Sequence, residues 1–190
     1  DTEAVVSTIV SDNYDAGVQC AKDMMKKKTS ANIIIVNQKA LNSINERVKG
    51  FRDTIKGHPQ YKIVEEKESA AEFEIAMKVM EKIIYEKKNY DVVMGGNDPI
   101  ALGCIAAMQM TDKTDQVMVY GVDGSPDGKA MIKAGFLEGT AAQSPIKIGE
   151  KAVQTAYSYL AGETVKKHVT IPVELITADN LKFYDMTGWQ

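Results

Sequence analysis

The chain reads Asn32-Ile33-Ile34-Ile35-Val36-Asn37 near its start, four β-branched side chains in succession between two asparagines. A second run of the same kind is Gln116-Val117-Met118-Val119-Tyr120-Gly121-Val122. Strands of a parallel sheet that are buried on both faces read as continuous apolar runs, whereas strands with one wet face alternate. Both stretches therefore predict buried strands of a parallel sheet.

Outward from these two runs, short β-branched stretches alternate with longer amphipathic ones. The other predicted strands are Val5–Val10, Tyr61–Glu65, Asp91–Gly95 and Gly139–Gln143. The predicted helices cover residues 14–28, 43–57, 70–88, 98–111, 125–135 and 146–161. Regular alternation of this kind is typical of an α/β fold with an open, mostly parallel sheet and helices on both faces, of the flavodoxin or Rossmann type. Residues 164–190 differ, because alternating apolar side chains predict one more strand and no regular helix follows it.

Composition excludes several classes of function. The 190 residues carry 23 Lys and Arg against 26 Asp and Glu, which gives a net charge of −3 and argues against a nucleic-acid partner. The longest apolar run is too short to cross a bilayer. Cys20 and Cys104 form no C-x-x-C pair, so neither a disulfide scaffold nor a Cys-based zinc site is expected. Asp1-Thr2-Glu3 lacks the basic and apolar regions that open a signal peptide.

Polar side chains follow the predicted strands where a ligand would lie. Open α/β sheets bind ligands in the crevice beyond the carboxyl ends of their strands. The residues that fall there are Arg47, Asn97, Asp123 and Gln143. Arg and Asn donate paired N–H groups to neighbouring hydroxyls and Asp accepts from two, so the set suits a neutral, polyhydroxylated ligand.

Each of these residues also has a simpler interpretation. Asn97 or Asp98 could be the N-cap of a helix that starts at Pro99. Asp123-Gly124 could be only a turn, and Gln143 only a loop residue. Arg47 could be a solvated helical charge.

Catalytic, metal and cofactor motifs do not emerge. Asp123-x-Ser125-x-Asp127-Gly128 has the opening of a calcium loop, but its twelfth position is Ala134 where a Glu is required. No glycine-rich nucleotide loop follows a strand. His58 and His168 lie away from the predicted rim, and neither pairs with a nucleophile. We therefore expect no catalytic residue, no metal site and no cofactor.

Five stretches taken together resemble the type I periplasmic sugar-binding proteins of ABC importers, with the ribose-binding branch as the nearest likeness. They are Val6–Gly17 (VSTIVSDNYDAG), Asn45–Phe51 (NERVKGF), Asn97–Gly103 (NDPIALG), Gly121–Gly128 (GVDGSPDG) and Gly139–Pro145 (GTAAQSP). The likeness runs in order through essentially the whole chain. The resemblance implies two α/β lobes, joined by three hinge strands, that close over a monosaccharide.

The resemblance also implies a division of the chain. Residues 1–10 would form a hinge strand and residues 11–143 the C-terminal, ligand-binding lobe. Residues 144–171 would be a remnant of the N-terminal lobe and hinge, and residues 172–190 a return to the hinge and C-terminal lobe. The rest of the N-terminal lobe is not in this chain.

For the site, the resemblance implies ligand contacts at Arg47, Asn97, Asp123 and Gln143, the same residues that the strand-end rule selects. An aromatic residue that stacks on ribose in relatives falls at Ala71, with Phe73 two positions later. The resemblance implies no catalysis. It implies an extracytoplasmic solute-binding protein, in the periplasm or lipid-anchored, that presents a monosaccharide or related polyol to an ABC permease or a membrane sensor.

Two other functions compete with this interpretation. One is the effector-binding core of a lac-repressor-type transcriptional regulator, which shares the fold, although Pro172–Asn180 is more typical of transport proteins. The other is an enzyme on a flavodoxin-like sheet, for which no nucleophile–base pair is found.

The predicted helix 146–161 carries an apolar stripe on one face. It consists of Ile148, Ala152, Val153, Ala156, Tyr157 and Leu160, spaced three and four residues apart. We expect a second chain, either the missing N-terminal lobe or another copy, to cover this stripe. The alternative is that the helix folds back on the C-terminal lobe.

Overall fold

The computed structural model describes residues 4–111 and 117–189. The strands are β1 (Thr8–Ser11), β2 (Ala31–Asn37), β3 (Tyr61–Glu68), β4 (Val92–Gly95), β5 (Met118–Asp123), β6 (Gly139–Ala142), β7 (His168–Ile171) and β8 (Glu174–Thr177). The helices are α1 (Asn13–Lys27), α2 (Asn42–Ile55), α3 (Phe73–Tyr85), α4 (Asp98–Gln109), α5 (Pro126–Lys133) and α6 (Pro145–Leu160), followed by the short 3-10 helix η2 (Leu181–Phe183).

Six strands form one sheet in the order β3-β2-β4-β5-β6-β8, parallel except for β8, which pairs antiparallel with β6 at one edge. The two apolar runs lie inside this sheet, where Ile33 to Val36 of β2 are fully buried. Strand order reverses between β2 and β4, which is the switch point where flavodoxin-like sheets bind ligands. The prediction of an open, mostly parallel α/β sheet is confirmed.

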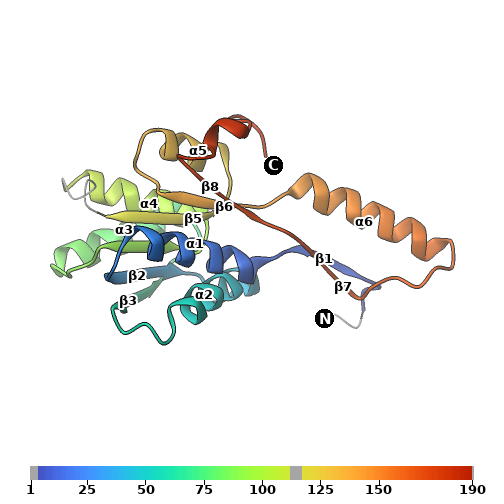
Figure 1. Ribbon diagram of the computed structural model, residues 1–190, viewed down its shortest axis with the longest axis horizontal. Helices are drawn as coiled ribbons and strands as arrows, with labels where there is room; N and C mark the ends of the chain where they lie inside the picture. The colour runs from blue at the N-terminus through green and yellow to red at the C-terminus, as the bar shows by residue number, and fades with distance from the viewer. Residues whose placement is uncertain (1–3, 112–116, 190) are drawn as a thin grey trace.

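Helices cover both faces of the sheet (Figure 1). α1 packs on α2, while α3 packs on α4, which also contacts α5. Local sequence sets where several helices begin: the Asp12 carboxylate accepts from the amide of Asp15 at the start of α1, and the Ser125 hydroxyl accepts from Gly128 at the start of α5. These first turns lie at the carboxyl ends of the strands, and so they place polar groups at one rim.

Several predicted boundaries were wrong. The first strand is Thr8–Ser11 rather than Val5–Val10, and β3 runs on to Glu68 instead of ending at Glu65. The helix predicted over 70–88 begins only at Phe73, since Ala71 has a φ of +59° that no helix accepts. The other helices and strands match within about two residues, the usual scatter of helix and strand ends. Gln116, the first residue of one predicted strand, lies outside the described residues.

The single strand expected in residues 164–190 is two strands. β7 pairs in parallel with β1 to form a separate two-stranded sheet, and β8 joins the six-stranded sheet. Pro172 and Val173 separate them, and Pro172 has no amide hydrogen to continue a ladder. One chain segment therefore crosses from the small sheet to the large one.

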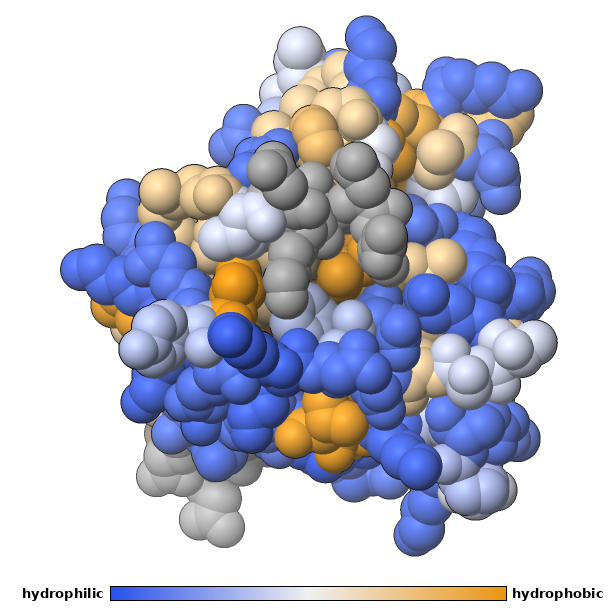
Figure 2. All heavy atoms as spheres, turned by 90° about the vertical axis from the view of Figure 1, so that its left-hand side faces the viewer, coloured by the Kyte–Doolittle hydropathy of each residue, from blue (hydrophilic) through white to orange (hydrophobic). Residues whose placement is uncertain are grey.

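α6 contacts β1 and projects away from the six-stranded sheet (Figure 1). None of its residues is buried, and Tyr157 and Leu160 are 72% and 80% exposed. The alternative that this helix folds back on the part of the chain that holds the six-stranded sheet is therefore wrong. The opposite end of the molecule is largely hydrophilic, with isolated apolar side chains (Figure 2).

Candidate functional site

Arg47 is a buried arginine at the switch point of the sheet. It lies on α2, and its side chain is 5% exposed. Nε donates to Asn13 Oδ1 at 2.9 Å and Nη1 donates to the Gly96 carbonyl at 2.9 Å. Nη1 also approaches Asp123 Oδ1 at 3.4 Å. The guanidinium thus joins the start of α1, the end of β4 and the end of β5.

Close packing of α1 on α2 brings Arg47 to this place. A Cβ atom on Gly17 would lie 1.8 Å from the Arg47 carbonyl oxygen, and one on Gly50 would lie 2.0 Å from the Tyr14 carbonyl oxygen. The two helices cross in contact at these glycines, so any side chain there would push α2 outward. Two positions without side chains therefore determine how deeply Arg47 enters the rim.

Asp123 and Gln143 complete a hydrogen-bonded cluster with Arg47. Gln143 Nε2 donates to Asp123 Oδ1 at 2.7 Å, and Gln143 Oε1 accepts from the Ser11 hydroxyl at 2.7 Å. Ser11 ends β1, which belongs to the small sheet, whereas Asp123 ends β5 in the large one. Gln143 therefore links the rim of the large sheet to the end of β1 in the small sheet.

Asn97 caps α4, as the simpler of its two interpretations predicts. Its Oδ1 accepts from the Ile100 amide at 3.0 Å. Its neighbours reach the cluster directly, since the Gly96 carbonyl accepts from Arg47 and the Asp98 amide approaches Asp123 Oδ2 at 3.4 Å. Asn97 therefore lies at the same rim, without a hydrogen bond to the other three predicted residues among those described.

The two charged groups of the cluster, Asp123 and Arg47, have shifted pKa values because they are removed from water. Burial and the nearby Asp98 carboxylate raise the pKa of Asp123 to about 6, against the opposing charge of Arg47. Burial lowers the pKa of the Arg47 guanidinium, although its neighbours Asp123 and Asp98 act in the other direction. A partly buried carboxylate and a buried guanidinium side by side can each form charge-assisted hydrogen bonds with hydroxyl groups.

The structure brings Arg47, Asp123 and Gln143 into direct contact, as the strand-end rule expected. Sequence reasoning missed three polar residues of the same network: Ser11, Asn13 and Asp98. All three lie at the end of a strand or in the first turn of a helix, and so they read as capping residues. Asn37 also ends a strand of the large sheet, but its amide donates to Glu66 on β3 at 2.6 Å.

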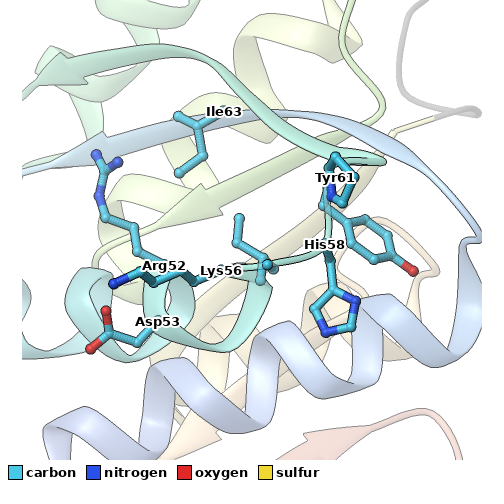
Figure 3. Close-up of a pocket in the computed structure, with 9 residues that line it drawn as sticks. Arg52, Asp53, Lys56, His58, Tyr61 and Ile63 are labelled. Atoms are coloured by element: carbon cyan, nitrogen blue, oxygen red, sulfur yellow. The ribbon is translucent and has the colours of Figure 1, made fainter.

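A hollow of about 480 Å³ lies at the other end of α2 (Figure 3). It is lined by Arg52, Asp53, Ile55, Lys56, Gly57, His58, Pro59, Tyr61 and Ile63. Arg52 forms an ion pair with Glu66, Asp53 pairs with Lys49 at 2.7 Å, and the Tyr61 hydroxyl donates to the Lys28 carbonyl at 2.7 Å. These polar groups have partners within the protein and lie at the amino ends of the strands, so the strand-end cluster is the better candidate.

Other kinds of site find little support in the part of the chain that the structure describes. No three His, Cys, Asp or Glu side chains there gather in a way that could hold a metal ion. Cys20 and Cys104 are buried free thiols, and burial raises the pKa of both. Among the described helices, none combines the length and apolar character of a membrane span.

The strand order and the rim cluster define an open α/β domain whose polar residues gather at the switch point of the sheet. The sequence profile of the family described as the periplasmic binding protein domain matches residues 1–164. The chain belongs to this family. The resemblance noted in the sequence is thereby confirmed.

Relatives within the family are binding proteins of sugar importers. The ribose import binding protein of Salmonella typhimurium is 31% identical over 175 residues, which cover 90% of this chain and 58% of that protein. The D-apiose import binding protein of Paraburkholderia graminis is 31% identical over 189 residues, which cover 97% of this chain and 60% of that protein.

Solved structures show the same fold. An ABC transporter solute binding protein from Bacillus halodurans with bound myo-inositol matches with a TM-score of 0.90 and 26% identity, over 96% of this chain and 64% of that one. The Caulobacter myo-inositol binding protein matches with a TM-score of 0.83 and 28% identity, over 91% and 60%. The chain thus spans less than two thirds of the length of these relatives.

Proposed function

We propose that this chain is the ligand-binding lobe of an extracytoplasmic solute-binding protein that takes a monosaccharide or related polyol. The observation that carries the proposal is the contact of Arg47, Asp123 and Gln143 at the carboxyl ends of the strands. Such proteins deliver their ligand to an ABC permease or a membrane sensor. The names of the relatives, which specify ribose and apiose import, support this choice over a transcriptional regulator.

The chemistry of the cluster fits hydroxyl groups. The Asp123 carboxylate accepts from sugar hydroxyls, while the Arg47 guanidinium donates to them. Hydrogen bonds among the described residues engage Nε and Nη1 of Arg47 and leave Nη2 to reach a ligand. Asn97 keeps its side-chain NH₂ as a further donor, because its cap uses only the oxygen. We assign these three residues and Gln143 to the ligand.

The protein is proposed to bind and release its ligand unchanged. The Ser11 hydroxyl of the cluster donates to the neutral amide oxygen of Gln143 and not to a base, which acyl or glycosyl transfer to the protein would need. Closure would instead be a hinge motion around the segments that cross between the two sheets. Gln143 is well placed to sense it, since it contacts both Asp123 and Ser11.

A complete site is proposed to need a second lobe. Residues 11–143 would form the C-terminal lobe, residues 1–10 a hinge strand, and residues 144–171 the remnant of the other lobe before the return at 172–190. α6, β1 and the residues just before β1 leave an apolar groove of about 340 Å³ with Val6, Ile9 and Leu160 in its lining. We propose that the missing N-terminal lobe or a second copy of the chain covers it.

A thermal-shift experiment tests the function. A ligand at ten times its dissociation constant adds about 1.4 kcal/mol to the free energy of unfolding. High sugar concentrations also stabilise proteins non-specifically by exclusion from their surface. The readout is therefore the difference in Tm shift between the unaltered chain and Asp123→Ala, with D-ribose, D-allose and myo-inositol as probes.

We expect the unaltered chain to gain more from at least one of the three probes than Asp123→Ala does. Arg52→Ala, in the hollow of Figure 3, is the matched control and should keep the full shift. Gln143→Ala should lose less than Asp123→Ala, because it removes a neutral hydrogen bond rather than a charged acceptor. Equal shifts in the unaltered chain and in Asp123→Ala would refute the assigned site.

A further inference from the structure

Asp98 is a buried carboxylate that the proposed ligand set does not use. It opens α4 directly after the cap residue Asn97 and is fully shielded from solvent. A buried carboxylate is costly unless its oxygens are hydrogen-bonded, so its partners indicate what it does.

Its two oxygens accept three hydrogen bonds from two different elements. Oδ2 accepts from the Ser125 amide at 2.8 Å and from the Ser125 hydroxyl at 2.7 Å. Oδ1 accepts from the Thr140 hydroxyl at 2.6 Å. A Cβ atom on Gly121 or Gly128 would lie 2.4 or 2.5 Å from these oxygens, so two glycines make room for the carboxylate. A larger residue at either glycine position would therefore displace the Asp98 carboxylate.

The segment that Asp98 holds is the turn after β5, which carries Asp123. Asp123 has a φ of +145° and Gly124 a φ of +70°. The first of these is a conformation that an L-residue rarely adopts and that persists only where the surroundings impose it. Thr140 also accepts from the Gly124 amide at 3.0 Å, so both residues after Asp123 are anchored through Asp98 or its partner.

We propose that Asp98 is a positioning residue, whose carboxylate holds the turn after β5 and so fixes where the Asp123 carboxylate points and which charge it faces. The inference concerns this chain's own turn and does not need the proposed sugar function, although its consequence for a ligand rests on that function.

The negative charge of Asp98 also affects the pKa of Asp123. Asp123 faces Arg47 from α2 and Asp98 from α4, while Cys20 on α1 and Lys129 on α5 lie near this pair of carboxylates. The Asp98 carboxylate raises the pKa of Asp123, and the Arg47 guanidinium lowers it. Removing the charge at position 98 should therefore lower the pKa of Asp123 below about 6.

The test uses two variants that separate charge from simple packing. Asp98→Leu keeps the branched shape of the side chain but removes its charge and both acceptor oxygens, so the Ser125 amide loses its hydrogen-bond partner. Thr140→Val keeps the Asp98 carboxylate and its two bonds to Ser125. Carboxyl carbon NMR follows the pKa of Asp123, and amide hydrogen exchange follows the Ser125 N–H.

In Asp98→Leu we expect the pKa of Asp123 to fall and the Ser125 amide to exchange at least tenfold faster, while amides of Ile33–Val36 stay protected. In Thr140→Val the pKa of Asp123 should not fall and Ser125 should stay protected. An Asp98→Leu variant with an unchanged Asp123 titration and a protected Ser125 amide overturns the proposal.

If Asp98→Leu does not fold, measurements on the unaltered chain still test the proposal. Two carboxylates that interact this closely titrate as a coupled pair, so the Asp98 carbon should report the Asp123 titration as well as its own. Independent single-step titrations, or a Ser125 amide that exchanges like an exposed loop, would overturn the proposal. Sugar binding enters neither readout, so a failure here is distinct from a failure of the proposed function.

Discussion

At the residue scale, Asp123 combines a strained backbone with a partly buried charge. Its pKa is raised from 3.8 to about 6. Between these two values the folded protein binds a proton that the unfolded chain has lost, so the free energy of unfolding falls as the pH rises through this window. The charged carboxylate thus costs stability above a pH of about 6, where its ability to accept from ligand hydroxyls is greatest.

Asp123→Asn should remove this pH dependence. We expect the difference in unfolding free energy between the unaltered chain and the variant to change by up to about 3 kcal/mol from pH ~4 to ~6, because each pKa unit corresponds to about 1.4 kcal/mol. Urea unfolding at several pH values measures it. Parallel pH profiles for the two proteins would show that Asp123 titrates normally.

Arg47→Lys tests whether the fork of the guanidinium matters. A lysine keeps the charge but cannot reach Asn13, Gly96 and Asp123 with the same planar geometry. Leaving one of these buried acceptors unpaired should cost about 1–3 kcal/mol in urea unfolding. Arg52→Lys is the matched control on the same helix, because its ion pair with Glu66 is partly exposed and should change stability by less than about 1 kcal/mol. Equal losses for both variants would contradict the account.

At the scale of secondary structure, the crossing of α1 and α2 positions the site. Gly17→Ala puts a methyl group against the backbone of α2 and should cost about 1–3 kcal/mol through overpacking. It should also displace Arg47, whose Nε–H resonance reports its bond to Asn13. Gly149→Ala is the control, because α6 has open space there and alanine favours a helix by about 0.5–1 kcal/mol. A destabilised Gly149→Ala or a tolerated Gly17→Ala, measured by urea unfolding, would reverse this reasoning.

The sequence pattern predicted most helices and strands, because strands buried on both faces, such as β2 and β5, read as continuous apolar runs. The pattern predicted only one strand in residues 164–190, because it cannot show that β7 and β8 join different sheets on either side of Pro172. It found Arg47, Asp123 and Gln143 because parallel strands end at one rim. It could not find Asp98, since a helix cap and a buried anchor read the same in sequence.

At the scale of the whole molecule, α6 and β1 present apolar surface with no cover in the part of the chain that the structure describes. Tyr157 is 72% exposed on α6, and Tyr85 is 86% exposed on α3 at a distance from this face. We expect the pure chain to self-associate at micromolar concentration, and Tyr157→Glu to weaken this association at least several-fold. Tyr85→Glu should leave it unchanged. Sedimentation velocity measures both, and a clean monomer of the unaltered chain would contradict the expectation of a covering copy.

The two-lobe account also limits what this chain can do alone. Ligand pockets normally enclose 70–90% of a small ligand, whereas a single lobe covers one side. We expect a dissociation constant in the millimolar range or weaker, about −4 kcal/mol. Micromolar binding of a monosaccharide by this chain, measured by calorimetry, would show that the site is already complete.

The central claim is that the strand-end cluster binds a sugar or polyol, and side-chain NMR of the unaltered chain tests it most directly. On titration with D-ribose, D-allose or myo-inositol, the account predicts weak, saturable shifts of the Arg47 Nε–H and of the Asn97 and Gln143 amide groups for at least one ligand. Shifts confined to the hollow around Arg52 and Tyr61, or no shift at the cluster up to the highest soluble concentrations, would contradict it.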